Sequence, residues 1–428
     1  MAQTTTNADA VLKIYYIGPI REQLNQKAVL MFAADDDEPA PKTSESKQWD
    51  WRGLSRESER IEYAGKKWVI PAHKSRNEGL GAIDEAGPVP TAGQQGFEDL
   101  EDVLRHNLGS IELSRYALRL SRRKPGTFIN LLTAETEGLV RDLRKDVNRQ
   151  AFGGQTGALA AVTADGANTA TVDSVQYLRV GMRINFVNRT NDAHLITYGT
   201  FRTITAINAS TKVITYDGAD LAVTAAMDVV RYLNWKKEIH GLTNLVDDIG
   251  TLHSVDSTAA GNEYWRSIDF ANGGAPWNED LGQQTLDAVG ASGNGETEIL
   301  LTTRGIRRRY INTLKSEKRF TNEDSVTLRG GFKAVMFNEY PMVFDDDCPK
   351  GTMWYINPDG LAWFFLPDGD QPGNWDWVDD DGAILTRKAD RTDAFEGYLA
   401  ADHNMAVTQR NIEGRNTGLE DDAAGVWN

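Results

Sequence analysis

The most regular apolar spacing in the chain predicts one long amphipathic helix. Apolar residues recur there at steps of three, four and seven positions: Phe128, Leu131, Leu132, Leu139, Leu143 and Val147. This spacing places them on one face of an α-helix. The sequence Pro-Gly-Thr at 125–127 is a start signal, and the glycines at 153 and 154 stop the run. A helix over Thr127–Phe152 would be about 39 Å long, which is unusual for a globular protein.

Residues 157–235 change to short β-branched runs separated by turn clusters. The expected strands are Thr169–Val172, Met182–Val187, Phe201–Ile207, Lys212–Tyr216 and Asp228–Leu233. The intervening segments NRTND, NAST and DGAD are rich in turn-forming residues. Charge density and helical periodicity both fall here, so the pattern predicts a small all-β domain inserted between regions of a different type.

From Leu242 onward, helical and strand patterns are mixed, which predicts an α+β domain. The expected helices are Asn278–Val289 and Gly305–Glu317, and the expected strands are Thr297–Thr303, Ala334–Phe337, Met342–Phe344, Met353–Ile356 and Leu361–Leu366. The tail after Gly414 is polar and is expected to fray.

The N-terminal part predicts extended segments rather than a core. Residues 35–60 are acidic and carry proline and serine, which favours an extended arm, with a mobile loop as the alternative. A β-prone run ending at Trp68–Ile70, a Gly- and Pro-rich loop, and an apolar return over Leu100–Leu120 predict a long β-hairpin. So long a loop usually serves a function or contacts a partner.

Composition is that of a folded globular protein with two or three packed units: 428 residues, 40% hydrophobic and 25% charged. The single cysteine, Cys348, cannot form an internal disulfide, which fits a reducing compartment and excludes a Cys-based zinc site. No membrane span and no secretory signal is expected. The 46 Lys and Arg residues against 62 Asp and Glu residues give a net charge of −16, so a general nucleic-acid binder is excluded.

Catalytic motifs do not point to an enzyme. H-E-x-x-H, G-x-S-x-G and G-x-G-x-x-G are all absent from the sequence. The acidic clusters at 35–37, 345–347, 379–381 and 420–422 lack the calcium-loop pattern and are interpreted as solvated turns. The six histidines show no i,i+3 or i,i+4 pair, so a histidine site would have to be assembled from distant segments. No cofactor and no metal is predicted.

An aromatic and acidic segment at 354–381 offers one enzymatic or binding alternative. Its tryptophans, with Asp368, Asp370 and Asp376, could form a sugar platform with paired carboxylates. However, Trp363, Phe364 and Phe365 are consecutive and would point to both faces of one strand, which favours core packing.

The order of these segments resembles that of major capsid proteins of tailed bacteriophages, which have the Hong Kong 97-type shell fold. The resemblance covers about residues 10–410 and is carried by the polar arm, the Gly-rich flap, and two stretches: SRRKPGTFINLLTAETEGLVRDLRKDVNRQAFGG and MVFDDDCPKGTMWYINPDGLAWFF. The divisions it implies are an N-terminal arm (1–57), an extended loop (58–122), a peripheral domain with the spine helix (123–156), an inserted β domain (157–235), peripheral strands (236–264), an axial domain (265–378), a peripheral return (379–412) and a C-terminal tail (413–428).

The resemblance implies a structural, non-enzymatic protein that assembles into pentamers and hexamers of an icosahedral head. That head would enclose double-stranded DNA without binding it specifically, and would form in the bacterial cytoplasm as part of the virion. The expected partners are other copies of the chain, a separate scaffolding protein, a portal and a decoration protein. Lys66, Lys67 and Lys74 lie in the extended loop, but no covalent crosslink is predicted. A nanocompartment shell of the same fold is the alternative within this class.

Subunit contacts are expected where apolar residues of the arm and loop need a cover and where charge is concentrated. The basic run RGIRRRYINTLKSEKRF carries its arginines on one helix face, and that face is expected to meet an acidic surface of a neighbouring subunit rather than DNA. The contact candidates are Trp49, Trp51, Glu59, Arg60, Lys66, Trp68, Arg307, Arg308 and Arg309.

Overall fold

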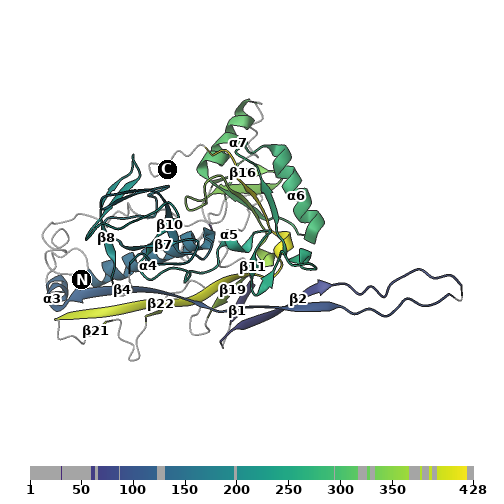
Figure 1. The fold of residues 1–428 in the computed structure, drawn as a ribbon, viewed down its shortest axis with the longest axis horizontal. Coiled ribbons are helices and arrows are strands. Elements are labelled where there is room, and N and C mark those ends of the chain that lie inside the picture. The colour runs from purple at the N-terminus through teal and green to yellow at the C-terminus, as the bar shows by residue number, and fades with distance from the viewer. Residues whose placement is uncertain are drawn as a thin grey trace.

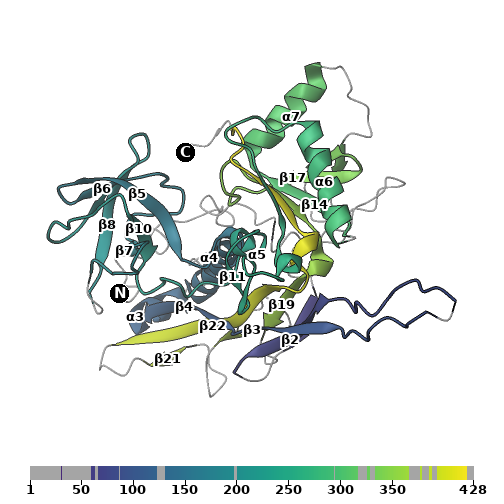
Figure 2. The same cartoon turned by 45° about the vertical axis from the view of Figure 1, so that its right-hand side comes forward.

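The computed structural model describes residues 30, 59–62, 66–85, 87–122, 131–196, 200–293, 295–316, 325–327, 333–365, 376–377, 385–387 and 393–421. A long sheet forms the base of the molecule, and a closed β-barrel and a second sheet with two helices stand above it (Figure 1). A two-stranded hairpin projects beyond the base, as the rotated view in Figure 2 also shows. Within the described ranges, no helix is long and apolar enough to cross a membrane.

The long sheet is organised around one strand, β22 (Ala394–Val407). Its neighbours are β4 (Arg105–Ser114), β19 (Leu361–Phe365), β20 (Asp376–Trp377) and β21 (Thr386–Arg387), all antiparallel to it, and β1 (Glu59–Glu62) pairs with β19 in parallel. Trp363, Phe364 and Phe365 on β19 are buried, so the core interpretation of this run is confirmed. β22 then leads through the short helix η3 (Arg410–Ile412) into the second sheet.

The predicted long helix is α4 (Leu131–Phe152), which follows α3 (Arg115–Arg122). It ends at Phe152, as the glycine pair predicts, while residues 127–130 of the expected start lie outside the described residues. α4 packs on β4 very closely, because a Cβ added to Gly109 would come within 2.8 Å of the Leu143 side chain. Glycine at this position therefore lets helix and strand approach.

The predicted hairpin is formed by β2 (Trp68–Ser75) and β3 (Gly96–Asp102). The strands are antiparallel, with Trp68 opposite Asp102 at the base and the segment 76–95 forming the far end. Only Val103 and Leu104 separate β3 from β4, so the hairpin continues directly into the long sheet.

The all-β domain is a closed barrel in the order β10-β5-β6-β9-β8-β7. Its strands are β5 (Ala158–Gly166), β6 (Thr169–Val172), β7 (Arg183–Asn188), β8 (Arg202–Asn208), β9 (Val213–Tyr216) and β10 (Met227–Arg231). The five predicted strands are present. β5 was missed because its alanine-rich sequence has weak strand propensity, although its side chains close the barrel core.

The second sheet has seven described strands: β13 (Ile268–Ala271), β23 (Gly414–Thr417), β18 (Met353–Ile356), β14 (Ile299–Thr302), β17 (Tyr340–Phe344), β16 (Lys333–Phe337) and β15 (Ser325–Thr327), in that order. The helices α6 (Glu279–Gly293) and α7 (Arg304–Ser316) share a core with it that includes Leu300, Met342 and Tyr355. Both predicted helices and four of the five strands predicted for this region are found here, whereas the fifth, predicted over Leu361–Leu366, is β19 of the long sheet. Smaller elements link the bodies: α5 (Leu242–Leu245), β11 (Thr251–Leu252), β12 (Val255–Asp256), η1 (Glu263–Trp265) and η2 (Pro358–Gly360).

The polar tail after Gly414 was expected to fray, but its described part, up to residue 421, begins with a strand. Gly414–Thr417 form β23, an internal strand between β13 and β18. Arg415 donates to Asp269 at 2.6 Å, and Asn416 donates to the Tyr355 hydroxyl at 2.9 Å. Buried polar side chains with full hydrogen bonding leave no apolar pattern in the sequence, which is why the strand could not be predicted from periodicity.

Candidate functional site: the hairpin, its base and the α4 junction

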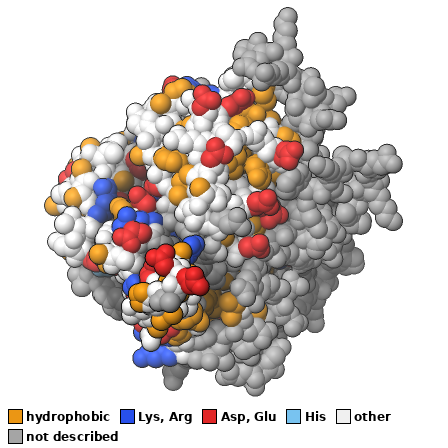
Figure 3. Space-filling model, turned by 90° about the vertical axis from the view of Figure 1, so that its right-hand side faces the viewer, with side chains coloured by type: hydrophobic (Ala, Val, Ile, Leu, Met, Phe, Trp, Pro, Cys, Tyr) orange, Lys and Arg blue, Asp and Glu red, His pale blue; other side chains and the backbone are white. Residues whose placement is uncertain are grey.

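The hairpin exposes large apolar side chains along its length. Leu80 is 84% exposed, Val89 79% and Phe97 66%, and Ile83 and Val69 are also more than half exposed. Figure 3 looks onto the end of the hairpin, where hydrophobic side chains lie among charged ones. Such a concentration of exposed apolar area on a projecting element is typical of a protein–protein contact surface.

The base of the hairpin is buried within the same chain. Trp68 is 3% exposed and stacks on Phe364 of β19 with ring centroids 4.3 Å apart, and its edge meets His253 at 4.9 Å. This corrects the expectation that Trp68 needs a neighbouring subunit to cover it. The sequence shows an aromatic residue in an arm-like segment, but it does not show that β1 and β19 bring the core to that segment.

Asp102, at the end of β3, joins the hairpin base to two histidines. Its Oδ2 lies 2.6 Å from His240 Nε2 and 3.2 Å from His253 Nδ1. The Val407 N–H on β22 donates to His253 Nε2 at 3.3 Å, so the proton of that neutral ring sits on Nδ1 and is donated to Asp102. Burial opposes ionisation of Asp102, yet the two histidine bonds outweigh it and hold the pKa of this carboxyl well below its ordinary value.

The possible ligand atoms of Asp102, His240 and His253 lie within 4.8 Å of one another, which is close enough to hold a metal ion. The backbone donor at His253 Nε2 argues against it, since a neutral ring that accepts there keeps a proton on Nδ1 and has no lone pair for a metal. Asp247, Asp248 and Asp269 form a second acidic group, and Arg415 already supplies positive charge to Asp247 and Asp269. We therefore interpret the first group as a hydrogen-bonded joint and the second as an ion-pair network.

The joint predicts a specific pH dependence. Burial, together with repulsion from His240 and Arg410, outweighs the attraction of Asp102 and lowers the pKa of His253 to about 4. The unfolded chain takes up this proton near pH 6.5 and the folded chain does not, so stability from this group is present at pH 7 and is lost as the pH falls to 4. Relative to His253→Gln, the wild type should lose about 3 kcal/mol of unfolding free energy between pH 7 and pH 4. Urea denaturation at both pH values measures this; parallel pH profiles for the two proteins would contradict it.

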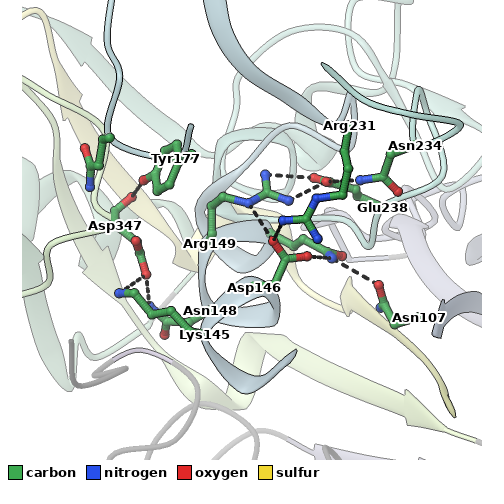
Figure 4. Close-up of polar contacts among 12 residues, drawn as sticks. Asn107, Lys145, Asp146, Asn148, Arg149, Tyr177, Arg231, Asn234, Glu238 and Asp347 are labelled. Atoms are coloured by element: carbon green, nitrogen blue, oxygen red, sulfur yellow. Dashed lines mark hydrogen bonds and ion pairs between the residues drawn. The ribbon is translucent and has the colours of Figure 1, made fainter. Parts of the chain in front are cut away.

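The polar side of α4 forms a second buried network, which ties the barrel to the rest of the molecule (Figure 4). Arg149 is 7% exposed and donates to both carboxylate oxygens of Glu238, and its Nε lies 3.2 Å from Asp146. Arg231, on barrel strand β10, donates to Asp146 at 3.0 Å. Burial opposes ionisation of Asp146, but Arg149 and Arg231 outweigh it and lower its pKa to about 2.

The acidic run 345–347 is not the solvated turn expected from the sequence. Asp345 and Asp347 are 2% and 3% exposed, and the Asn148 amide on α4 donates to both. Lys145 lies 2.6 Å from Asp347, and the Leu30 N–H donates to Asp345 at 3.0 Å. Burial and the neighbouring Asp347 raise the pKa of Asp345 to about 6. Partners from α4 and from Leu30, which are remote in sequence, make this burial possible.

The remaining predicted contact residues are placed as follows. Trp49 and Trp51 lie outside the described residues. Glu59 and Arg60 are on β1, where their backbones pair with Ala362 and Trp363, and Lys66 is exposed beside the hairpin base. Arg307, Arg308 and Arg309 are on α7, and Arg309 forms a two-point contact with Glu420 of the same chain. Their participation in subunit contacts stays a prediction.

Two tryptophans of the sugar-platform alternative belong to the core. Trp354 is 1% exposed and Trp363 is fully buried, so neither ring can stack on a sugar. Trp375 lies outside the described residues, and Trp377 is on the short strand β20.

Comparison with known proteins gives the fold. No protein-family model and no curated protein sequence matches the chain. Among solved structures, the cyanophage A-1(L) capsid asymmetric unit is similar with a TM-score of 0.51 and 12% identity over 86% of this chain and 91% of that chain. The holo-SrpI encapsulin complex from Synechococcus elongatus PCC 7942 gives 0.48 and 8% identity over 99% and 98% of the two chains. Mycobacterium phage Bobi gives 0.44 and 10% identity over 97% and 98%.

The protein therefore has a mixed α and β fold that is similar to the fold of the cyanophage A-1(L) capsid chain. More narrowly, its fold is that of tailed-bacteriophage major capsid proteins, as the order of segments in the sequence implied.

Proposed function

We propose that the chain is the major capsid protein of a tailed bacteriophage, which assembles into the pentamers and hexamers of an icosahedral head enclosing double-stranded DNA. The observation that supports this proposal is the fold, combined with a projecting hairpin whose apolar side chains are exposed to solvent in the single chain. A free monomer would leave this surface in water, whereas a second copy of the chain would bury it.

Each body of the fold corresponds to one domain of the proposed capsid subunit. The long sheet with α4 serves as the peripheral domain, the seven-stranded sheet with α6 and α7 as the axial domain around the symmetry axes, and the barrel as the inserted domain. The net charge of −16 suits a shell that encloses DNA without holding it. A separate scaffolding protein, a portal and a decoration protein are the proposed partners, and the virion is the proposed location.

Electron microscopy of the pelletable fraction tests this proposal, using the chain expressed alone and beside neighbouring open reading frames. Closed shells or capsomer rings would support it, and nuclease-protected DNA inside closed shells would separate a viral head from a nanocompartment that encloses a protein cargo. Small uniform particles in every preparation would contradict it.

The hairpin supplies a sharper version of the same test. Leu80→Asp combined with Val89→Asp should abolish assembly while the chain stays folded, because both side chains are exposed in the monomer and charge at a buried interface is costly. Thr91→Asp combined with Gln94→Asp adds the same charge to exposed positions of the same loop and should reduce assembly much less. If the Leu80→Asp and Val89→Asp variant assembled as well as this control, the hairpin would not be part of the proposed interface.

A further inference from the structure

Opposite charges are segregated on the two helices of the seven-stranded sheet. α6 contains Glu279, Asp280 and Asp287 and no Lys or Arg. α7 contains Arg304, Arg307, Arg308, Arg309 and Lys315 and no Asp or Glu. Figure 1 shows α6 along the right-hand side of this body and α7 at its upper left, so the acidic helix and the basic helix occupy different places on it.

The acidic surface extends beyond α6 itself. Glu296 precedes β14, Glu339 lies in the turn between β16 and β17, and the neighbouring Asn338 donates to Gln283 of α6. Figure 3 shows acidic side chains spread over the upper part of this face. The acidic face is thus defined by Glu279, Asp280, Asp287, Glu296 and Glu339, all exposed, and in the described part of the chain none of them forms an ion pair.

The basic surface is held in place by contacts within the chain. The guanidinium groups of Arg304 and Arg307 lie over the Phe344 ring, at 4.7 Å and 5.2 Å from its centroid. Arg304 pairs with Asp346 and Arg309 with Glu420, so two carboxylates offset part of the charge of this helix. Arg308 is exposed and precedes the exposed Asn312 by one helical turn. These positions define the basic face of α7.

We infer that the acidic face of one subunit packs against the basic face of α7 in the next subunit. The inference rests on the proposed function and names the partner of this surface as a second copy of the chain. Two acidic faces repel each other, as do two basic ones, so a two-fold contact through either face is disfavoured. A contact between unlike faces is heterologous, and its repetition about one axis closes a ring, which is the geometry that a pentamer or hexamer needs.

Charge reversal tests the pairing. Asp280→Lys with Asp287→Lys should lower the assembled fraction at least tenfold, and so should Arg308→Glu with Asn312→Glu, because each places like charges across the contact. All four positions are exposed in the monomer, so folding should be preserved, and circular dichroism checks this. A control pair in the barrel, Asp165→Lys with Ala167→Lys, adds nearly the same charge at exposed positions and should assemble normally.

Combining the variants gives the decisive result. A chain carrying all four substitutions restores opposite charges across the contact and should assemble again. A mixture of the two double variants should form only rings with an even number of subunits, because the two chains must alternate. Normal assembly of the variant with Asp280→Lys and Asp287→Lys would contradict this inference but not the proposed function. A wild-type chain that never assembles would contradict both the inference and the proposed function.

Discussion

Replacing Arg149 with methionine should lower the free energy of unfolding by about 3–5 kcal/mol, because it leaves the buried carboxylate of Glu238 without its counter-ion. Arg149 is 7% exposed and contacts Glu238, which is 2% exposed, and Asp146. Burial raises the pKa of Glu238 even with Arg149 present, and the hydrogen bond that its carboxylate accepts from the Asn234 amide supplies no charge to replace that of Arg149. Urea denaturation at pH 7 followed by circular dichroism measures the change.

A second substitution separates the charge from the packing. Arg149→Met with Glu238→Gln removes both members of the pair, so the double variant should be less destabilised than Arg149→Met alone. Lys237→Met, at an exposed position on the same connection, should change stability by no more than about 0.5 kcal/mol. A loss below about 1 kcal/mol for Arg149→Met would show that the α4 junction does not stabilise the fold through this pair.

Trp68→Ala should cost about 3–5 kcal/mol, the usual range for removal of a large buried aromatic side chain. The indole is 3% exposed and lies between Phe364 and His253, so its loss opens a cavity where β2 meets β19. Because this contact fixes the hairpin base, we also expect faster hydrogen exchange of the amides in β2 and β3.

The neighbouring residue provides a matched control for Trp68. Val69 is 52% exposed on the opposite face of the same strand, so Val69→Ala should alter stability by no more than about 0.5 kcal/mol. If Trp68→Ala behaved like Val69→Ala, the indole would not anchor the hairpin. Unchanged exchange in β2 with reduced global stability would show that the hairpin base has other sufficient anchors.

Much of the fold could be predicted from the sequence because its signals are local. The apolar steps of α4, the glycine pair that ends it, and the β-branched runs of the barrel each depend on neighbouring residues. The buried run Trp363-Phe364-Phe365 was also predictable, since consecutive large apolar residues on a strand need cover on both faces. The order of such segments was enough to indicate the fold.

The candidate site was less predictable because its partners are remote in sequence. Asp102 meets His240 and His253 across more than a hundred residues, and Asn148 meets Asp345 and Asp347 across about two hundred. No spacing rule links such positions, so a buried network and a solvated charged turn look alike in the sequence. For the same reason, the sequence of β23 resembles a polar tail and Trp68 resembles an uncovered aromatic residue.

The path of the chain from β22 to β23 has a mechanical consequence. β3 runs into β4, β4 is zipped to β22 along ten residue pairs, and β22 passes through η3 into the interior of the second sheet. At η3 the buried Arg410 donates to the carbonyls of Asn244, Leu245 and Trp265, which fastens the crossing on several sides. A pulling force on the projecting hairpin is therefore transmitted along extended backbone to the second sheet. The long sheet and the second sheet should resist tension together rather than move as two hinged parts.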